Sequence, residues 1–303
     1  MKNVLYINSV SDYCKLRNYE VFHPQVSIVD FDKVNKTGYN NQNFTAFHYQ
    51  CYAIFLKDST GCKFKYGGKP YDYDEGTLVF VSPNQIVELG DVDPNYIPKG
   101  YALLFHPDLL LRTELGKHMD QYSYFSYSTH EALHISAKER KVILSLFDKI
   151  QQELEQNLDK HSKKLIVANI ELFLDYCMRF YERQFLTREV ENKGSLDKFD
   201  SMLSDYFSSE KPLKDGLPSV AYFADAINLS PNYFGDLVKK TTGISAQEYI
   251  QNKMIQIAKN KIYDHDKSVS EIANELGFKY SQHFTRMFKK ATGQTPIQFR
   301  HLN

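Results

Sequence analysis

Two pairs of adjacent lysines occupy equivalent places in the last third of this 303-residue chain, Lys239-Lys240 and Lys289-Lys290. Ammonium groups in such a pattern bind the phosphate oxygens of nucleic acids. The competing explanation is that cations at the C-terminal end of a helix stabilise its dipole, by about 0.3–1 kcal/mol. That explanation accounts for one pair, whereas the same pair at a second, corresponding place favours phosphate contact.

Several polar residues upstream of each lysine pair have the chemistry needed to recognise base edges. Arg286 could donate two hydrogen bonds to guanine, Gln282 could pair with adenine, and Asp236 could accept from cytosine. The alternative for Asp236 and Gln282 is solvated polar surface, and Arg286 could instead contact a phosphate or form a surface ion pair. The candidate DNA-contacting residues are Asn232, Tyr233, Asp236, Lys239, Lys240, Ser281, Gln282, His283, Thr285, Arg286, Lys289 and Lys290. Tyr233 is also a candidate for the core of its helical hairpin.

The elements that must position these residues follow from an internal repeat. The pairs that match at an offset of 50 are Phe234 with Phe284, Lys239-Lys240 with Lys289-Lys290, and Gly243 with Gly293. Upstream the offset is 49, with Ala224 matching Ala273 and Asn228 matching Gly277. A shift of one residue between two helices is the expected effect of a variable turn. The repeat therefore predicts two copies of one helical hairpin.

Each copy has the sequence pattern of a helix-turn-helix. A small alanine in the first helix lets the two helices cross closely. Four residues later Asn228 or Gly277 occupies the turn, and both residue types tolerate a positive φ angle. In the first copy Ser230 is placed to cap the second helix and Pro231 to begin it. The sequence thus predicts where each turn lies and where the first copy's second helix starts.

Residues 245–263, between the two copies, are predicted to form a single linker helix. Its apolar side is formed by Ile250, Met254, Ile257, Ala258 and Ile262. A helix of this length spans about 28 Å. With the reach to each hairpin, the two second helices would be separated by about one turn of DNA, ~34 Å. They could then enter successive stretches of the major groove. We expect the later helix to carry more of the specificity, because the earlier one contains Gly235 and the acidic Asp236.

The N-terminal half has a different pattern, in which short β-rich runs alternate with turn residues. These runs are Gln25–Val29, Cys51–Leu56, Cys62–Tyr66 and Gly76–Val81. Short strands at this spacing predict an antiparallel sandwich or barrel.

Two helices are predicted after the strands, because apolar residues recur at spacings of three and four over 143–154 and 165–180. The second helix has two apolar stripes: Ile166, Ile170 and Leu174, and beside them Leu165, Leu172, Phe173 and Tyr176. One stripe could cover the barrel or the first helix. The other would be exposed in a monomer, so we expect a homodimer.

Composition and motifs exclude several other classes of protein. Lys and Arg total 37 and Asp and Glu total 37, so the chain is not a uniformly basic nucleic-acid coat. It contains no Walker loop, GxGxxG or GxSxG motif. His48 and His106 lack the companion ligands of a metal site, so we expect no metal, cofactor or catalytic residue. Four scattered cysteines and no long apolar run predict a cytoplasmic protein without a membrane span.

The C-terminal third resembles the AraC/XylS family of bacterial transcription regulators. The likeness extends from Leu196 to the end and is carried by Gly277-Phe278, Phe284-Thr285-Arg286-Met287-Phe288-Lys289-Lys290, Gly293, Thr295-Pro296 and Phe299-Arg300. Membership implies a DNA-binding regulator, usually with a separate sensing or dimerising domain. The segment Gly68–Pro83 resembles the cupin-like barrel that often precedes such domains.

We therefore expect an α+β protein: a cupin-like antiparallel β-barrel at 1–135, a helical dimerisation segment at 136–186, a linker at 187–195 and tandem helix-turn-helix units at 196–303. The expected function is sequence-specific transcriptional regulation under a small-molecule effector, whose binding residues are not assigned. The expected partners are double-stranded DNA, a second copy and, for an activator, RNA polymerase. One alternative is an effector-independent protein whose N-terminal domain only dimerises or recruits a partner. The other, a cupin enzyme fused to a DNA-binding module, is disfavoured by the missing metal ligands.

Overall fold

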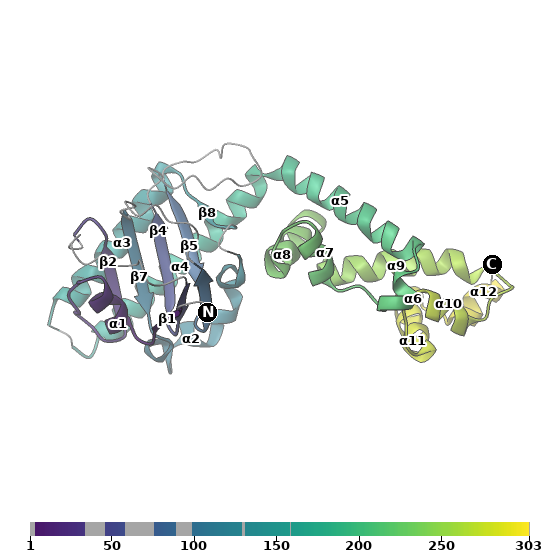
Figure 1. Cartoon of the computed structure of the whole chain (residues 1–303), viewed down its shortest axis with the longest axis horizontal. Helices are drawn as coiled ribbons and strands as arrows, with labels where there is room; N and C mark the ends of the chain where they lie inside the picture. Colours follow the sequence, from purple (N-terminus) through teal and green to yellow (C-terminus); the bar gives the residue numbers. More distant parts are fainter. Residues whose placement is uncertain are drawn as a thin grey trace. The chain divides into compact units, whose positions relative to one another are not determined.

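The computed structural model describes residues 4–33, 46–57, 76–88, 99–128, 131–157 and 159–302. The chain forms two compact units, Met1–Leu186 and Thr187–Asn303 (Figure 1). All strands of the described residues belong to the first unit, and the second is helical. The predicted strand at 62–66 and residues 68–75 of the cupin-like segment lie outside the described residues.

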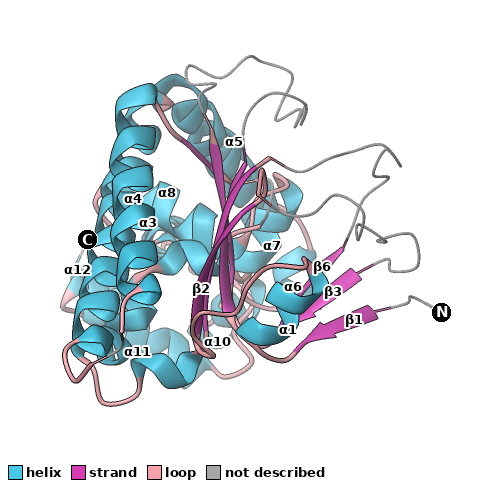
Figure 2. Ribbon diagram, turned by 90° about the vertical axis from the view of Figure 1, so that its left-hand side faces the viewer, coloured by secondary structure: helices cyan, strands magenta, loops and turns pink. Residues whose placement is uncertain are grey.

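The strands of the first unit form two sheets, which Figure 2 shows as separate groups. The larger sheet has the order β2 (Val26–Asp30), β7 (Gly100–Phe105), β4 (Tyr52–Lys57), β5 (Thr77–Val81) and β8 (Leu133–His134), and all neighbours are antiparallel. The smaller sheet has the order β1 (Val4–Ile7), β3 (Ala46–Tyr49) and β6 (Gln85–Glu88). In the smaller sheet β1 runs parallel to β3, and Tyr6, His48 and Ile86 lie side by side across it.

The predicted antiparallel barrel is wrong for the part of the chain that the structure describes. These residues form two sheets rather than one closed sheet, and one pair of strands is parallel. Helix α1 (Val10–Leu16) follows β1, and its buried Val10, Tyr13 and Cys14 fill the core beside the sheets. Parallel strands cannot be joined by a hairpin, so β1 needs a long connection before β3. The unit is α+β, and the cupin likeness is not confirmed.

Two long helices complete the first unit, α3 (Ala137–Glu155) and α4 (Ser162–Thr187). A capping box begins α3, in which Ser136 and Glu139 each accept from the other's backbone N–H. The predicted apolar positions Ile143, Leu146, Phe147, Ile150 and Leu154 are all buried. Shorter elements precede α3: η3 (Pro107–Leu110), α2 (Glu114–His118), η4 (Met119–Gln121) and η5 (Ser123–Ser126).

Helix α4 has one buried side and one partly exposed side. The buried side consists of Ile166, Ile170, Phe173 and Leu174, and Phe173 stacks on Phe147 of α3 with ring centroids 5.3 Å apart. Leu165 and Leu172 are 47% and 43% exposed. The second apolar stripe is therefore narrower than predicted, because Phe173 belongs to the buried side.

The second unit consists of eight helices over its described residues: α5 (Glu189–Ser208), α6 (Lys211–Asp215), α7 (Val220–Ala226), α8 (Pro231–Thr242), α9 (Ala246–Ile262), α10 (Val269–Glu275), α11 (Ser281–Thr292) and α12 (Pro296–Leu302). The predicted linker at 187–195 is helical rather than a loop, since α5 begins at Glu189. Its polar residues include good helix formers, and the cost of Gly194 within a helix is only about 1 kcal/mol. Asn192 is buried, so the segment packs against its surroundings.

None of the helices described is long and apolar enough to span a bilayer. Over the same described residues, no group of three or more His, Cys, Asp or Glu side chains is arranged to hold a metal ion.

Candidate DNA interface

Helices α7 and α8 form the first helix-turn-helix. Asn228 in the turn has a φ of 58°, the left-handed conformation predicted for it. The Ser230 hydroxyl accepts a hydrogen bond from the Tyr233 N–H at 3.2 Å, and Pro231 is the first residue of α8. Gly243 ends α8 with a φ of 79°. The predicted turn, cap and helix start are confirmed.

Helices α10 and α11 form the second helix-turn-helix. Gly277 in its turn has a φ of 93°, and Gly293 ends α11 with a φ of 80°. A capping box of Ser268 and Glu271 begins α10. The start of α11 differs from that of α8, because the side chain of its N-cap residue, Tyr280, makes no capping hydrogen bond.

Aromatic side chains form the core of each hairpin. Phe234 contacts Phe199 of α5 with ring centroids 4.9 Å apart, and Phe284 contacts Phe278 at 5.4 Å. Tyr233 belongs to the same core, with only 3% of the residue exposed. This burial favours the core role considered for Tyr233 over a contact with DNA.

The other candidate residues lie on the outer side of α8 and α11. Asn232, Lys239, Lys240, Gln282, His283, Arg286, Lys289 and Lys290 are exposed, and Asp236, Ser281 and Thr285 are half-buried. A spacing of four and then three residues places Asn232, Asp236 and Lys239 along one side of α8, here called the α8 face. The same spacing aligns Gln282, Arg286 and Lys289 as the α11 face. Each residue of the α8 face is the repeat equivalent of one in the α11 face.

The two faces differ in charge at their centres. Asp236 is the repeat equivalent of Arg286, so an anion in α8 stands where α11 has a cation. Phosphate repels a carboxylate and attracts a guanidinium. The α11 face is therefore better suited to a nucleic-acid duplex than the α8 face.

Two exposed residues next to α11 were not among the DNA-contacting candidates predicted from the sequence. Tyr280 is 57% exposed, and the Lys279 ammonium lies 5.7 Å from the centre of its ring. The same ring lies 5.7 Å from that of His283. The sequence difference at the N-cap position could have drawn attention to Tyr280, because the first copy has a capping serine where the second has an aromatic residue.

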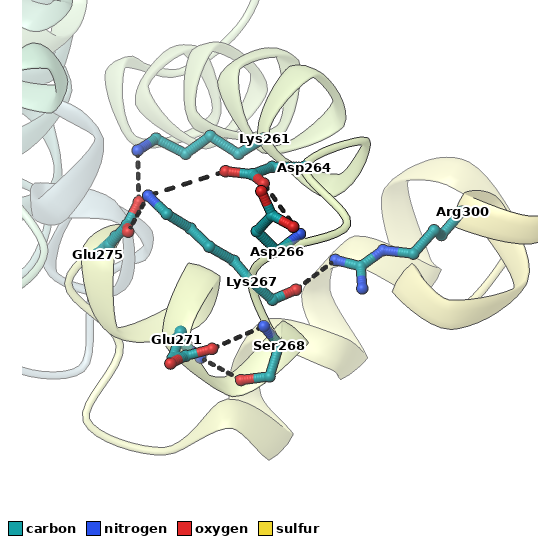
Figure 3. A network of polar contacts seen from close by, with 8 residues as sticks. All are labelled: Lys261, Asp264, Asp266, Lys267, Ser268, Glu271, Glu275 and Arg300. Atoms are coloured by element: carbon teal, nitrogen blue, oxygen red, sulfur yellow. Dashed lines mark hydrogen bonds and ion pairs between the residues drawn. The ribbon is translucent and has the colours of Figure 1, made fainter.

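A polar network uses several cations of the C-terminal region for the fold (Figure 3). Glu275 of α10 accepts from Lys261 at 2.6 Å and from Lys267 at 2.5 Å. Hydrogen bonds from Lys261 and Lys267 hold the pKa of Glu275 below its usual range. The Arg300 guanidinium donates to the carbonyl oxygens of Ile262, at 2.7 Å, and Lys267, at 2.9 Å. These three cations join the end of α9 to α10 and α12, so their contacts within the fold account for them without DNA.

Comparison with known proteins agrees with this geometry. Residues 223–301 match the helix-turn-helix domain family. The chain is 25% identical over 239 residues to an uncharacterized HTH-type transcriptional regulator, YijO, of Escherichia coli, covering 75% of this chain and 78% of the relative. It is 23% identical over 265 residues to the HTH-type transcriptional activator RhaS of an Enterobacter species, covering 85% and 87%. A solved structure, ToxT of Vibrio cholerae, aligns with 84% of this chain and 91% of its own at 12% identity, with a TM-score of 0.30.

The two hairpins and these relatives define the chain as a helix-turn-helix transcriptional regulator and not an enzyme. The motif at 277–300 lies in the turn after α10, on α11 and at the start of and along α12, so the chain carries a helix-turn-helix domain of the AraC type over residues 223–301.

Proposed function

We propose that α8 and α11 bind successive major-groove segments of one DNA duplex, and that the protein regulates transcription from that site. The observation that carries the proposal is the repeated set of exposed or half-buried polar residues, the α8 face and the α11 face. Helix α9, with 17 residues, is about 26 Å long. That length suits two helices that must reach adjacent turns of the groove.

Specificity should lie mainly in the α11 face. Arg286 is central in that face, and a guanidinium forms two hydrogen bonds with guanine. Lys289 and Lys290 lie in the last turn of α11, where we place the phosphate backbone. On α8, Asp236 would accept from a cytosine amino group, while Lys239 and Lys240 would contact phosphate.

The test separates base contacts from phosphate contacts. Arg286→Ala should cost about 1–3 kcal/mol on the preferred DNA and relax the preference at one base pair. Lys289→Ala should weaken binding to preferred and random DNA alike, and lower the slope of log affinity against log salt by about one unit. Affinity is measured on a panel of single-base variants at several salt concentrations. If Arg286→Ala weakens binding to every variant by the same factor, the guanidinium does not read a base.

We propose in addition that a small-molecule effector binds in the N-terminal unit. The Tyr13 and Ser27 hydroxyls are buried and make no hydrogen bond of normal geometry with the described residues, although the Arg17 side chain lies beside Tyr13 and the Cys14 thiol beside Ser27. Buried polar groups of this kind cost free energy unless they are paired. The neighbours of Tyr13 in the core are mostly apolar and aromatic, including Tyr49 and Phe55. A ligand that accepts or donates hydrogen bonds within this core would satisfy both hydroxyls.

The exposed stripe of α4 supports a homodimer. Leu165 and Leu172 lie one heptad apart on one side of the helix. A two-fold axis beside α4 would pair this stripe with itself. The alternative to effector control is that the N-terminal unit serves only this dimer or recruits a partner. Since RhaS is named an activator, contact with RNA polymerase is a further part of the proposal, as is a cytoplasmic location beside the DNA.

A further inference from the structure

The turn of the second hairpin contacts a backbone segment outside both helix-turn-helix motifs. Helix α6 lies beside α10 (Figure 1), and the chain leaves α6 through Gly216. A Cβ atom built on Gly277 would lie 2.7 Å from the carbonyl carbon and oxygen of Gly216 and 3.1 Å from the Leu217 nitrogen. Side chains do not approach backbone atoms so closely. This contact therefore requires glycine at position 277.

The first hairpin shows that a positive φ at this place in the turn does not by itself require glycine. Asn228, at the equivalent position, has a φ of 58°. Asparagine is one of the few residues other than glycine that adopt this conformation readily. The close approach of Gly216 to the second turn, together with the larger φ of 93° at Gly277, explains the sequence difference between the two turns.

Gly216 is held in place by groups that belong to the first half of the unit. Its carbonyl oxygen accepts from the Tyr206 hydroxyl of α5 at 2.9 Å, and its N–H donates to the Pro212 carbonyl at 3.0 Å. The Tyr206 ring is buried and contacts Phe223 of α7, with ring centroids 6.2 Å apart. Tyr206 thus connects the core of the first hairpin to the segment that touches the second turn.

Among the contacts that attach the second hairpin to the rest of the unit, two lie on opposite sides of the end of α10. On one side Glu275 binds Lys261, at the end of α9. On the other side Gly277 packs on Gly216, which Tyr206 holds. The Gly277 contact is the one that ties the second turn to the segment held by Tyr206, and so to the core of the first hairpin.

We propose that the Gly216–Gly277 contact sets the orientation of α11 relative to α8, and that Gly277 is a positioning residue for the spacing of the two DNA segments that these helices bind. This inference rests on the proposed function, because it requires both helices to bind one duplex. A side chain at position 277 would push the second turn away from Gly216 and displace α11 from its groove.

The test compares two exchanges of the turn residues in the full-length chain. Gly277→Asn introduces into the second turn the residue that the first turn accepts, and Asn228→Gly is the matched control. The probe is a duplex selected by the wild-type chain from random DNA, together with versions whose spacer is lengthened or shortened by single base pairs. Gly277→Asn should lose about 10- to 100-fold on the selected spacing, because simultaneous engagement of linked sites is impaired. Its preference among spacers should shift or flatten, whereas Asn228→Gly should keep the wild-type spacing preference.

A wild-type spacing profile for a folded Gly277→Asn would overturn the inference while leaving the proposed function intact. If Gly277→Asn does not fold, Tyr206→Phe replaces it, since this change removes only the hydrogen bond to Gly216. It should shift the spacing profile in the same direction by a smaller factor, and an unchanged profile would again overturn the inference. A wild-type chain that selects no DNA would contradict the proposed function itself, and the inference with it.

Discussion

Tyr13 and Tyr124 are both buried, but only the Tyr124 hydroxyl makes a hydrogen bond of normal geometry, donating to the Leu174 carbonyl at 2.9 Å, whereas Tyr13 has the Arg17 side chain beside it. Burial raises the pKa of both phenols, although for Tyr13 the nearby Arg17 guanidinium opposes part of the rise. Both hydroxyls are therefore neutral over the physiological range. Replacing each tyrosine by phenylalanine removes its hydroxyl, and the two substitutions should change the free energy of unfolding differently.

Without ligand, Tyr13→Phe should leave the stability unchanged or raise it by up to about 1 kcal/mol, because it removes a buried hydroxyl that makes no hydrogen bond of normal geometry. The control Tyr124→Phe should cost about 0.5–1.5 kcal/mol. Chemical unfolding of both variants measures this difference. A clear loss of stability in Tyr13→Phe would mean that the chain itself satisfies the hydroxyl, and the main support for an effector site would be gone.

The role of a residue could be predicted from the sequence where it depends on that residue's own backbone preference or on hydrogen bonds to its near neighbours in the chain. Asn228 in the turn and Ser230 at the cap follow from the conformations and hydrogen bonds those residue types favour. Tyr233 and the cations Lys261, Lys267 and Arg300 could not be assigned in this way. Their roles depend on which helices pack together, which charge and spacing along the chain do not specify.

At the scale of elements, the link between α9 and α10 depends on the charge of Glu275. Its pKa is held below the usual 4.5 in the folded chain. The stabilisation is therefore fully present above pH 4.5 and is lost as the pH falls through the lowered folded value. Glu275→Gln should destabilise the second unit by about 1 kcal/mol at pH 7, and this difference should vanish in acid.

Because the chain contains no tryptophan, Tyr280→Trp supplies a fluorescent probe next to α11 for this measurement. The control is Glu210→Gln, whose pair with Lys214 is exposed on both sides and should contribute little. An equal effect of Glu275→Gln at neutral and acidic pH would exclude the ion pairs as its cause.

Elements with a long, regular spacing of apolar residues or a clear internal repeat could be predicted from the sequence. Short elements, and those that depend on tertiary packing, could not. The buried side of α3 follows from its apolar spacing, and the hairpins follow from the repeat. Strand β1 has four residues and α1 has seven, too short for a clear period. The polar composition of 187–195 favoured a loop, but α5 extends through it because helix formers and tertiary packing outweigh one glycine.

At the scale of the whole molecule, the exposed leucines of α4 predict self-association. The full-length chain should sediment as a dimer at micromolar concentrations, and Leu165→Lys combined with Leu172→Lys should make it a monomer. Lysine in an apolar interface leaves a charge without a partner and costs several kcal/mol. The control Ile297→Lys changes an exposed residue of α12 and should leave the dimer intact. A wild-type chain that sediments as a monomer would contradict the dimer.

In the proposed function, α8 and α11 both bind one DNA duplex. Selection of DNA by the full-length chain from a random library tests it most directly. We expect an enriched motif with two blocks of specified base pairs. The centres of the two blocks should lie about 10–10.5 base pairs apart, which is the spacing of successive major-groove segments on one side of DNA. The block that loses its preference in Arg286→Ala should be the more strongly specified one. A single block, or no enrichment over random sequence, would contradict the claim.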